Sequence, residues 1–401
     1  MAESFPLDGV RVLDLSRVLA GPWASQSLAD LGASVVKIER PGVGDDTRAW
    51  GPPYFETGDG EISAYFMSAN RGKRSVAVDI ANPRGAELVQ RLARDADIVI
   101  ENFKQGDAAR RGLDYETLAA DNPGLIYCSI TGFGQTGPYK HRPGYDFMIQ
   151  GMGGLMSITG EPDEKSGDGP QKVGVALADI LTGLYATIAI LGALHERERS
   201  GQGQYIDMAL LDVLTACLAN QATNYLVSGV APGRLGNAHP NVVPYQTFQT
   251  ADGFVIVAVG NDAQFARLCR TIERNDLATD ERFLSNASRV QHRDALAEEI
   301  QAEMAKRPLD DWLARLEEAG VPCGPINTID RVFADPQVQH RGMQMAIDGM
   351  PLVANPIRYS RSALQYDRAP PVLGANTAEV LSELGLDAAD IEKLKSEGVV
   401  E

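Results

Sequence analysis

Short β-branched runs alternate with helical stretches over the first 130 residues of the chain. The helical stretches include Pro22–Leu31 and Pro83–Asp95. This alternation is typical of βαβ units, so it predicts an α/β fold with a doubly wound parallel sheet. The runs expected to form the strands are Val10–Leu15, Ser34–Glu39, Ser75–Asp79, Asp97–Glu101 and Leu125–Ile130.

Two longer helices are predicted after these strands. Residues 183–199 have an apolar first half and a charged second half, and Ser200-Gly201 is a stop signal. A second long helix, about Asp207–Val227, is expected to follow a short strand.

The composition then changes, which indicates a second domain. Residues 229–243 are rich in Gly, Pro and Asn, as linkers are. A new unit of strands and helices begins near Pro244 and ends near Pro325. We therefore expect a large domain over 1–228, a linker and smaller α+β domain over 229–330, and a return to the large domain over 331–401.

One carboxylate, Asp179, lies where the apolar run Val173–Ile180 leads into a predicted helix. An aspartate there can accept hydrogen bonds from first-turn N–H groups, so the first interpretation is a helix cap worth about 1 kcal/mol. The same position also keeps a carboxylate ionised in a poorly hydrated place, as a nucleophilic carboxylate requires. The local pattern leaves both interpretations open.

Charge limits the partners of the protein. The net charge of −17 argues against general nucleic-acid binding, which needs a basic face. An anionic ligand is repelled at long range, so it would require a local cluster of Arg and Lys. The positions of the basic residues are therefore informative.

Other features of the sequence favour a cytoplasmic enzyme or binding protein with no membrane segment. The N-terminal residues lack a signal-peptide pattern, and the longest apolar run, Leu184–Leu194, is too short to span a bilayer. The four cysteines are scattered, and no His or carboxylate spacing suggests a metal. No G-x-G-x-x-G follows the first strand, so a dinucleotide site is not expected.

A series of motifs along the whole chain resembles the class III CoA-transferases, the family that includes formyl-CoA transferase and the carnitine CoA-transferases. Each motif is weak alone, but their order is highly specific. The motifs are Leu7–Leu15, Ala20–Pro22, Leu31–Ala33, Lys37–Pro41, Gly44–Arg48, Asn70–Ser75, Glu101–Gly106, Gly132–Gly134, Gly144–Asp146, Ala178–Asp179, Gly201–Gln204, Asp335–Val338 and Leu373–Gly374.

The resemblance implies that Asp179 is a catalytic nucleophile that forms an acyl anhydride and then an aspartyl-CoA thioester, with no metal. It also places Gly260 and Asn261 in a loop over the active site, although an ordinary strand-end turn explains Gly260 equally well. The family further implies an interlocked homodimer. The overall pattern is most similar to members that take succinyl-CoA as donor and a dicarboxylate such as glutarate as acceptor.

CoA is anionic and is expected as a substrate, with no tightly bound cofactor. In an open parallel sheet, ligands bind at the carboxyl ends of the strands. Phe103 could pack on the adenine. Most single Lys or Arg residues are solvated surface charges, but for the whole set the family resemblance favours CoA binding. The candidates for CoA binding are Arg17, Arg40, Arg74, Asn102, Phe103, Lys104, Arg110 and Tyr145.

Tyr145 separates two related functions. The α-methylacyl-CoA racemases resemble this family, but they pair the aspartate with a histidine where this chain has Gly144-Tyr145-Asp146. Tyrosine is a poor base near neutral pH, so a racemase-type isomerase is disfavoured. The structural alternative for Tyr145 is a core aromatic whose hydroxyl bonds to backbone.

Two alternatives remain open from the sequence. His239 lies in the linker, where a turn-stabilising role competes with contact to the substrate. The whole protein could also be a catalytically silent CoA-binding subunit, in which Asp179 contributes only to stability.

Overall fold

The computed structural model describes residues 4–58, 60–164 and 168–401. The chain forms two compact units, the first of which contains Met1–Leu155, Val173–Thr223 and Gln337–Glu401. The second contains Met156–Lys172 and Asn224–Pro336. The division expected from the sequence did not assign 156–172 to the small unit. Backbone hydrogen bonds such as that from the Gly236 N–H to Gly160 O (3.1 Å) hold this segment in the small unit. The local sequence pattern does not predict such contacts.

The first unit is built on a six-stranded sheet of order β5-β2-β1-β6-β7-β8, in which every neighbouring pair is parallel. The expected α/β class and parallel sheet are confirmed. The strands are β1 (Arg11–Asp14), β2 (Ser34–Glu39), β5 (Lys73–Ala77), β6 (Ile98–Glu101), β7 (Ile126–Thr131) and β8 (Tyr205–Ala209).

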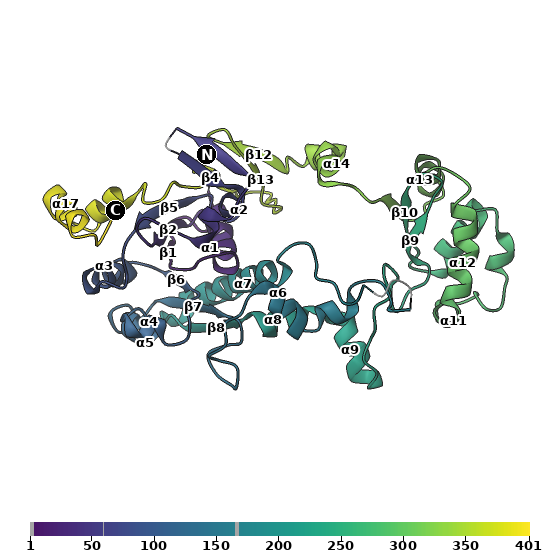
Figure 1. Cartoon of the computed structure of the whole chain (residues 1–401), viewed down its shortest axis with the longest axis horizontal. Coiled ribbons are helices and arrows are strands. Elements are labelled where there is room, and N and C mark those ends of the chain that lie inside the picture. Colours follow the sequence, from purple (N-terminus) through teal and green to yellow (C-terminus); the bar gives the residue numbers. More distant parts are fainter. Residues whose placement is uncertain (1–3, 59, 165–167) are drawn as a thin grey trace. The chain divides into compact units, whose positions relative to one another are not determined.

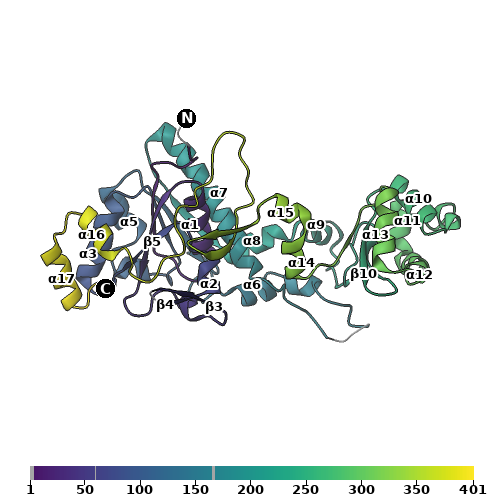
Figure 2. The same ribbon diagram turned by 90° about the horizontal axis from the view of Figure 1, so that it is seen from above.

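Helices pack on both faces of this sheet, because its central strands are apolar on both sides (Figures 1 and 2). One core contains residues of α1 (Ala20–Asp30), α6 (Asp146–Met152), α7 (Leu177–Ser200) and α8 (Leu210–Cys217). The opposite core contains residues of α3 (Pro83–Arg94), α5 (Tyr115–Asp121), α16 (Thr377–Glu383) and α17 (Ala388–Ser396). The C-terminal segment thus completes the core begun by the first strands.

Two helix predictions were wrong in their bounds. The helix expected from residue 183 begins six residues earlier, at Leu177, so Asp179 lies inside it. The long helix expected over Asp207–Val227 is instead the end of β8, then α8, then α9 (Ala219–Ser228). Asp207 is held in the strand by pairing with Ser129, and Ala219 has a positive φ of 47° that separates the two helices.

Small elements form a further apolar cluster in the first unit. The β3–β4 and β12–β13 hairpins share an apolar cluster with α2. These elements and the remaining short helices are η1 (Asp46–Ala49), β3 (Tyr54–Thr57), β4 (Gly60–Ser63), α2 (Ala64–Met67), α4 (Asp107–Arg110), η2 (Leu155–Ile158), β12 (Gln344–Ile347) and β13 (Met350–Val353).

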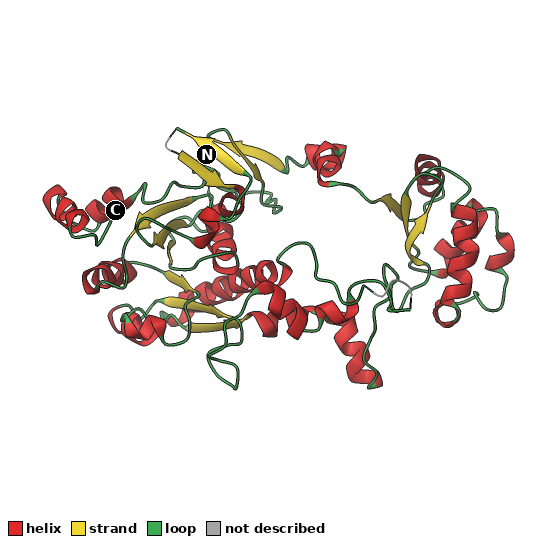
Figure 3. Cartoon of the chain, in the orientation of Figure 1, coloured by secondary structure: helices red, strands yellow, loops and turns green. Residues whose placement is uncertain are grey.

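The second unit has its own core, in which helices pack on an antiparallel three-stranded sheet of order β11-β10-β9 (Figure 3). The buried Phe248, Val257 and Trp312 are central to this core. The elements of the unit and of the return are β9 (Tyr245–Gln249), β10 (Phe254–Ala258), α10 (Asp262–Thr271), η3 (Asn275–Ala278), α11 (Asn286–Gln291), α12 (Arg293–Met304), α13 (Leu309–Glu318), β11 (Cys323–Pro325), α14 (Ile329–Ala334) and α15 (Pro336–His340).

By length and composition alone, α7 is apolar enough to cross a membrane, with a mean hydropathy of 1.8 over its best window. The expectation that its apolar run is too short considered only Leu184–Leu194, whereas the helix has 24 residues. Ala186, Ile190 and Ala193 of α7 are buried in the core of the first unit. A core helix of a soluble protein passes the same test.

Candidate active site

Asp179 lies in the first turn of α7 but does not cap it. Ala176 precedes the helix and provides no side-chain cap. The carboxylate of Asp146, 32 residues earlier, accepts a hydrogen bond from the Ala178 N–H instead (2.8 Å). The interpretation of Asp179 as the helix cap is therefore wrong, because another aspartate satisfies this end of the helix.

Asp179 is half-buried. Burial, and secondly the negative charge of Asp146, raise its pKa to about 7. No hydrogen bond or cation from the described residues lowers that pKa. A carboxylate without such partners retains its basicity and is free to attack an acyl group.

Asp146 is held in place by Gln150, one turn later in α6. The Gln150 amide donates to Asp146 Oδ2 (2.8 Å), and its oxygen accepts from the Val173 N–H (2.9 Å). Gln150 is fully buried. Asp146 and Gln150 together fix the chain that leads into α7.

Tyr65 of α2 is affected by the charges of the same aspartates. Burial raises the pKa of its hydroxyl, and the charges of Asp179, Asp146 and Asp45 raise it further. Its ring also makes an edge contact with Trp50, with 5.1 Å between the centroids. Tyr65 therefore provides a neutral hydroxyl near Asp179, a residue that the sequence analysis missed.

Tyr145 immediately precedes Asp146 and is 65% exposed, so the core-aromatic interpretation is wrong. Its position depends on a close contact between Gly144 and Gly132. A Cβ added to Gly144 would lie 2.2 Å from Gly132 Cα, and the reverse distance is 2.4 Å. This backbone contact explains both glycines of the motifs.

Arg17 and Asn102 meet at the carboxyl ends of β1 and β6. Asn102 Oδ1 accepts from the Arg17 N–H (2.9 Å), and its amide donates to Arg17 O (2.7 Å). The Arg17 side chain is half exposed and paired with Asp46 (3.0 Å). The guanidinium is thus accessible, whereas Asn102 is engaged with backbone.

Other candidates follow the same edge of the sheet. Arg40 follows β2 and is exposed, and Lys104 follows β6 and is also exposed. Arg110 is exposed and paired with Asp107. Phe103 packs partly against the apolar core, so only part of its ring is accessible.

Arg74 lies elsewhere. It is near the amino end of β5, opposite Val36, and its side chain is largely buried. It forms ion pairs with Glu383 (2.7 Å) and Glu379 (3.2 Å) of α16. Arg74 therefore lies apart from the other CoA-binding candidates. Its place in the sequence beside a strand gave no sign of these partners in α16.

Gly260, Asn261 and His239 belong to the second unit. Asn261 caps α10 by accepting from the Gln264 N–H (2.9 Å), and Gln264 in turn accepts from the Gly260 N–H (2.7 Å). His239 Nδ1 accepts from the Asn241 N–H (3.0 Å), which gives the imidazole a local turn contact.

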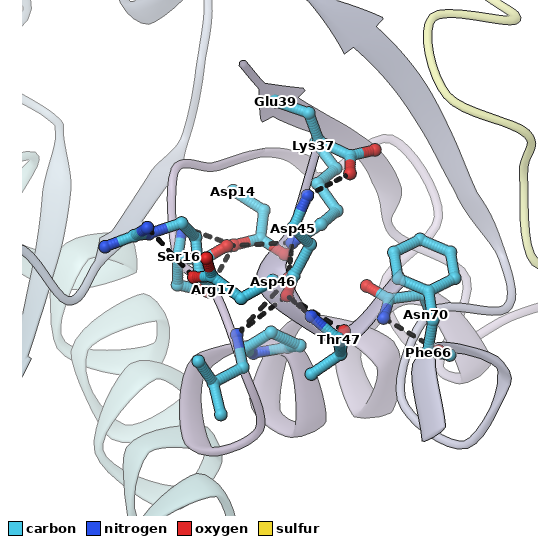
Figure 4. Close-up of polar contacts among 12 residues, drawn as sticks. Asp14, Ser16, Arg17, Lys37, Glu39, Asp45, Asp46, Thr47, Phe66 and Asn70 are labelled. Carbon is cyan, nitrogen blue, oxygen red and sulfur yellow. Dashed lines mark hydrogen bonds and ion pairs between the residues drawn. The ribbon is translucent and has the colours of Figure 1, made fainter. Parts of the chain in front are cut away.

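The sequence analysis also missed a buried group of charges near Arg17, which includes Asp14, Lys37 and Asp45 (Figure 4). Lys37 pairs with Asp45 (2.9 Å) and Lys73 with Asp14 (3.1 Å), and all four side chains are fully buried. A lysine inside an apolar strand such as Ser34–Glu39 signals a buried partner, because unpaired buried ammonium groups are costly.

Within the described ranges, no group of three or more His, Cys, Asp or Glu side chains is arranged to hold a metal ion. The four cysteines are free. The candidate site thus combines the Asp179 carboxyl, its neighbouring aspartate and tyrosines, and basic residues on one edge of the sheet.

Comparison with known proteins identifies the family. The family model of CoA-transferase family III matches residues 7–377. The chain is 56% identical to a succinate–glutarate CoA-transferase of Agrobacterium fabrum, over 94% of this chain and 96% of the relative. It is 45% identical to a succinyl-CoA:glutarate CoA-transferase of Mus musculus, over 99% and 90% of the two chains. A CAIB/BAIF family protein from Brucella suis has a similar structure, with a TM-score of 0.86 and 54% identity over 95% of this chain and all of the other. The chain belongs to CoA-transferase family III and is a CoA-transferase.

Proposed function

We propose that the protein transfers CoA from succinyl-CoA to a small dicarboxylate such as glutarate, with Asp179 as the nucleophile. The environment of Asp179 carries the proposal for the mechanism: a desolvated carboxyl, raised in pKa and without a cation partner in the described structure. The names of the relatives from Agrobacterium fabrum and Mus musculus support the choice of substrates.

The first half-reaction consumes the donor. The Asp179 carboxylate attacks the thioester carbonyl of succinyl-CoA, forming a mixed anhydride and releasing the CoA thiolate. The thiolate attacks the Asp179 carbonyl carbon, which gives an aspartyl-CoA thioester and free succinate. Low hydration favours both steps, because water would hydrolyse the anhydride and the thioester.

The second half-reaction reverses these events with the acceptor. The acceptor carboxylate attacks the aspartyl thioester, which gives a new anhydride and the CoA thiolate. The thiolate then attacks the acceptor acyl carbon, releasing the new acyl-CoA and the Asp179 carboxylate. Charge and protons balance, so the cycle needs no external acid or base.

CoA binding is assigned to the carboxyl edge of the sheet, where Arg17, Arg40 and Lys104 are exposed. Arg110 and the accessible part of Phe103 extend this surface, and Tyr145 is exposed beside Asp146. Asn102 orients the Arg17 backbone. The roles of Gly260, Asn261 and His239 over the active site remain expectations from the family resemblance.

A second copy of this chain is proposed as the partner. Leu184, Tyr185, Ile188 and Leu191 of α7 form an exposed apolar stripe on a helix whose other face is in the core. Such a stripe is typical of a surface that is covered in an assembly. The proposed state is an interlocked cytoplasmic homodimer, and light scattering after gel filtration would give twice the chain mass of 43.1 kDa.

Trapping of the intermediate tests the mechanism. The enzyme is incubated with succinyl-CoA and hydroxylamine, and the peptide containing Asp179 is analysed by mass spectrometry. Conversion of the Asp179 carboxyl to a hydroxamate is expected, and Asp179→Asn should abolish it. Asp212→Asn is a matched control, because Asp212 occupies the same third position of an uncapped helix, α8, but is exposed.

The alternatives give different results in the same preparation. A racemase-type isomerase would exchange the α-hydrogen of a 2-methylacyl-CoA with deuterium without any acceptor acid. A silent CoA-binding subunit would bind CoA without acyl exchange, and Asp179→Ala would change its stability only.

A further inference from the structure

The turn between β1 and α1 has a strained backbone. Val18 has a φ of 72°, in the left-handed region that a β-branched residue rarely adopts. The turn contains no glycine that would accept this conformation freely. Such strain persists only where the surroundings impose it, and it concentrates at functional sites.

Three side chains from outside the turn hold its backbone. Lys37 donates to Ser16 O (2.8 Å), and Asn102 bonds to both the N–H and the carbonyl of Arg17. The Val18 N–H donates to both carboxylate oxygens of Asp45 (3.2 Å each). Asp45 alone contacts the strained residue among these three.

Asp45 is itself rigidly held. Its carboxylate pairs with Lys37 (2.9 Å), and neither side chain is exposed. It also accepts from the Thr47 N–H (3.0 Å) and hydroxyl (2.8 Å). Burial alone would raise the pKa of Asp45, but Lys37 and Thr47 hold that pKa below its usual range, so the carboxylate stays charged at neutral pH.

The turn leads directly to the neighbourhood of Asp179. Leu19 precedes α1, and the Ala20 carbonyl lies so close to Gly183 that a Cβ there would be 2.7 Å away. Gly183 is one helical turn after Asp179. The charges of both Asp179 and Asp45 contribute to the raised pKa of the Tyr65 hydroxyl.

We propose that Asp45 is a positioning residue for the Asp179 site. Its buried carboxylate imposes the left-handed conformation of Val18 and thereby fixes the backbone between β1 and α1 beside Asp179. This inference rests on the proposed function, because the site that Asp45 positions is that of Asp179. The side-chain contacts of Asp45 are with Val18, Lys37 and Thr47, so it acts through the turn.

The test combines Asp45→Asn with Val18→Gly. Asp45→Asn keeps one oxygen, but its NH2 group must then face either the Lys37 ammonium or the Thr47 donors, so the hold on Val18 is weakened. The kcat should fall on the order of 100-fold, since small displacements of a site have large effects, with little change in KM for succinyl-CoA. Val18→Gly alone should keep activity, and the double variant should recover most of the loss, because glycine adopts a positive φ without strain. A merely stabilising role of Asp45 would not be rescued by glycine at position 18.

Asp30→Asn is the matched control. Like Asp45, Asp30 is buried and paired with a cation, in this case Arg71 (2.6 Å). Asp30 is the last residue of α1, however, and does not hold the turn before that helix. It should lose stability while its kcat is kept. If Asp45→Asn does not fold, Asp45→Glu takes the place of Asp45→Asn in every comparison. Asp45→Glu keeps the charge beside Lys37 but displaces the carboxylate from Val18.

The outcomes are separable from those of the proposed function. Unchanged kcat in Asp45→Asn, or no recovery in the double variant, overturns the positioning role while leaving CoA transfer intact. If the wild-type protein transfers CoA to no acid, the proposed function fails, and crystal structures then decide. A φ of residue 18 that stays positive in Asp45→Asn overturns the inference. A φ that is no longer positive in Asp45→Asn but is positive again in the double variant supports the inference.

Discussion

Asp146 accepts a hydrogen bond from the first turn of the helix that carries Asp179, and its charge raises the pKa of Asp179. Asp146 thus caps the helix, a role that the sequence had suggested for Asp179. The second aspartate is left without a partner in the described structure, desolvated and with a pKa of about 7.

This relationship predicts the pH dependence of the reaction. Asp179 must be ionised to attack, so kcat/KM should rise with pH to a plateau, with a midpoint of about 7. Asp146→Asn removes the repulsion but keeps an oxygen for the Ala178 N–H, so the midpoint should move to lower pH. The profile of Asp212→Asn should match that of the wild type, and an unmoved midpoint in Asp146→Asn would contradict the coupling.

Glu101 predicts a second pH dependence, in stability. Burial raises the pKa of this carboxyl to about 7, with Asp207 adding to it against hydrogen bonds from Ser129 and Phe103. Between about pH 4.5 and 7 the Glu101 carboxyl is ionised in the unfolded chain but protonated in the folded chain. The free energy of unfolding therefore falls as pH rises through this window. Glu101→Gln should reduce the fall by about 3 kcal/mol at most, measured by urea unfolding across the window. A curve parallel to that of the wild type would contradict this assignment.

The two ends of the sheet predict different roles for two basic residues. Lys104→Ala should raise KM for succinyl-CoA, because an exposed cation at the carboxyl edge attracts the phosphates of CoA. Arg74→Ala should leave KM unchanged and lower stability, since it leaves Glu379 and Glu383 of α16 unpaired. Steady-state kinetics at two salt concentrations gives both KM values, and only the Lys104 effect should weaken with salt. Urea unfolding measures the stability of Arg74→Ala. A raised KM in Arg74→Ala would return that residue to the CoA site.

The strands and the edge of the site could be predicted from the sequence because their signals are local. Val10–Leu15 and Ser34–Glu39 are runs of β-branched and apolar residues that pair as expected in β1 and β2. The carboxyl-edge rule then brought Arg17 and Asn102 to one place.

The errors arise where a side chain finds a partner far along the chain. Arg74 pairs with glutamates 305 and 309 residues later, and Asp146 caps a helix 32 residues away. Neither separation leaves a periodic signal. The strain at Val18 is likewise imposed by tertiary contacts, against the intrinsic preference of valine.

The contact between Gly144 and Gly132 predicts the effect of a single methyl group. Gly144→Ala would place a Cβ 2.2 Å from the Gly132 Cα, and both partners are backbone, so the chain itself must move. A cost of about 1–3 kcal/mol is expected, as for overpacked sites, together with lower kcat because Tyr145 and Asp146 follow directly. Gly174→Ala is the control: nothing lies within 4 Å of its added Cβ, so stability should stay within about 0.5 kcal/mol. Urea unfolding and initial rates measure both variants, and equal stability of Gly144→Ala and wild type would show that this contact does not hold Asp146 in place.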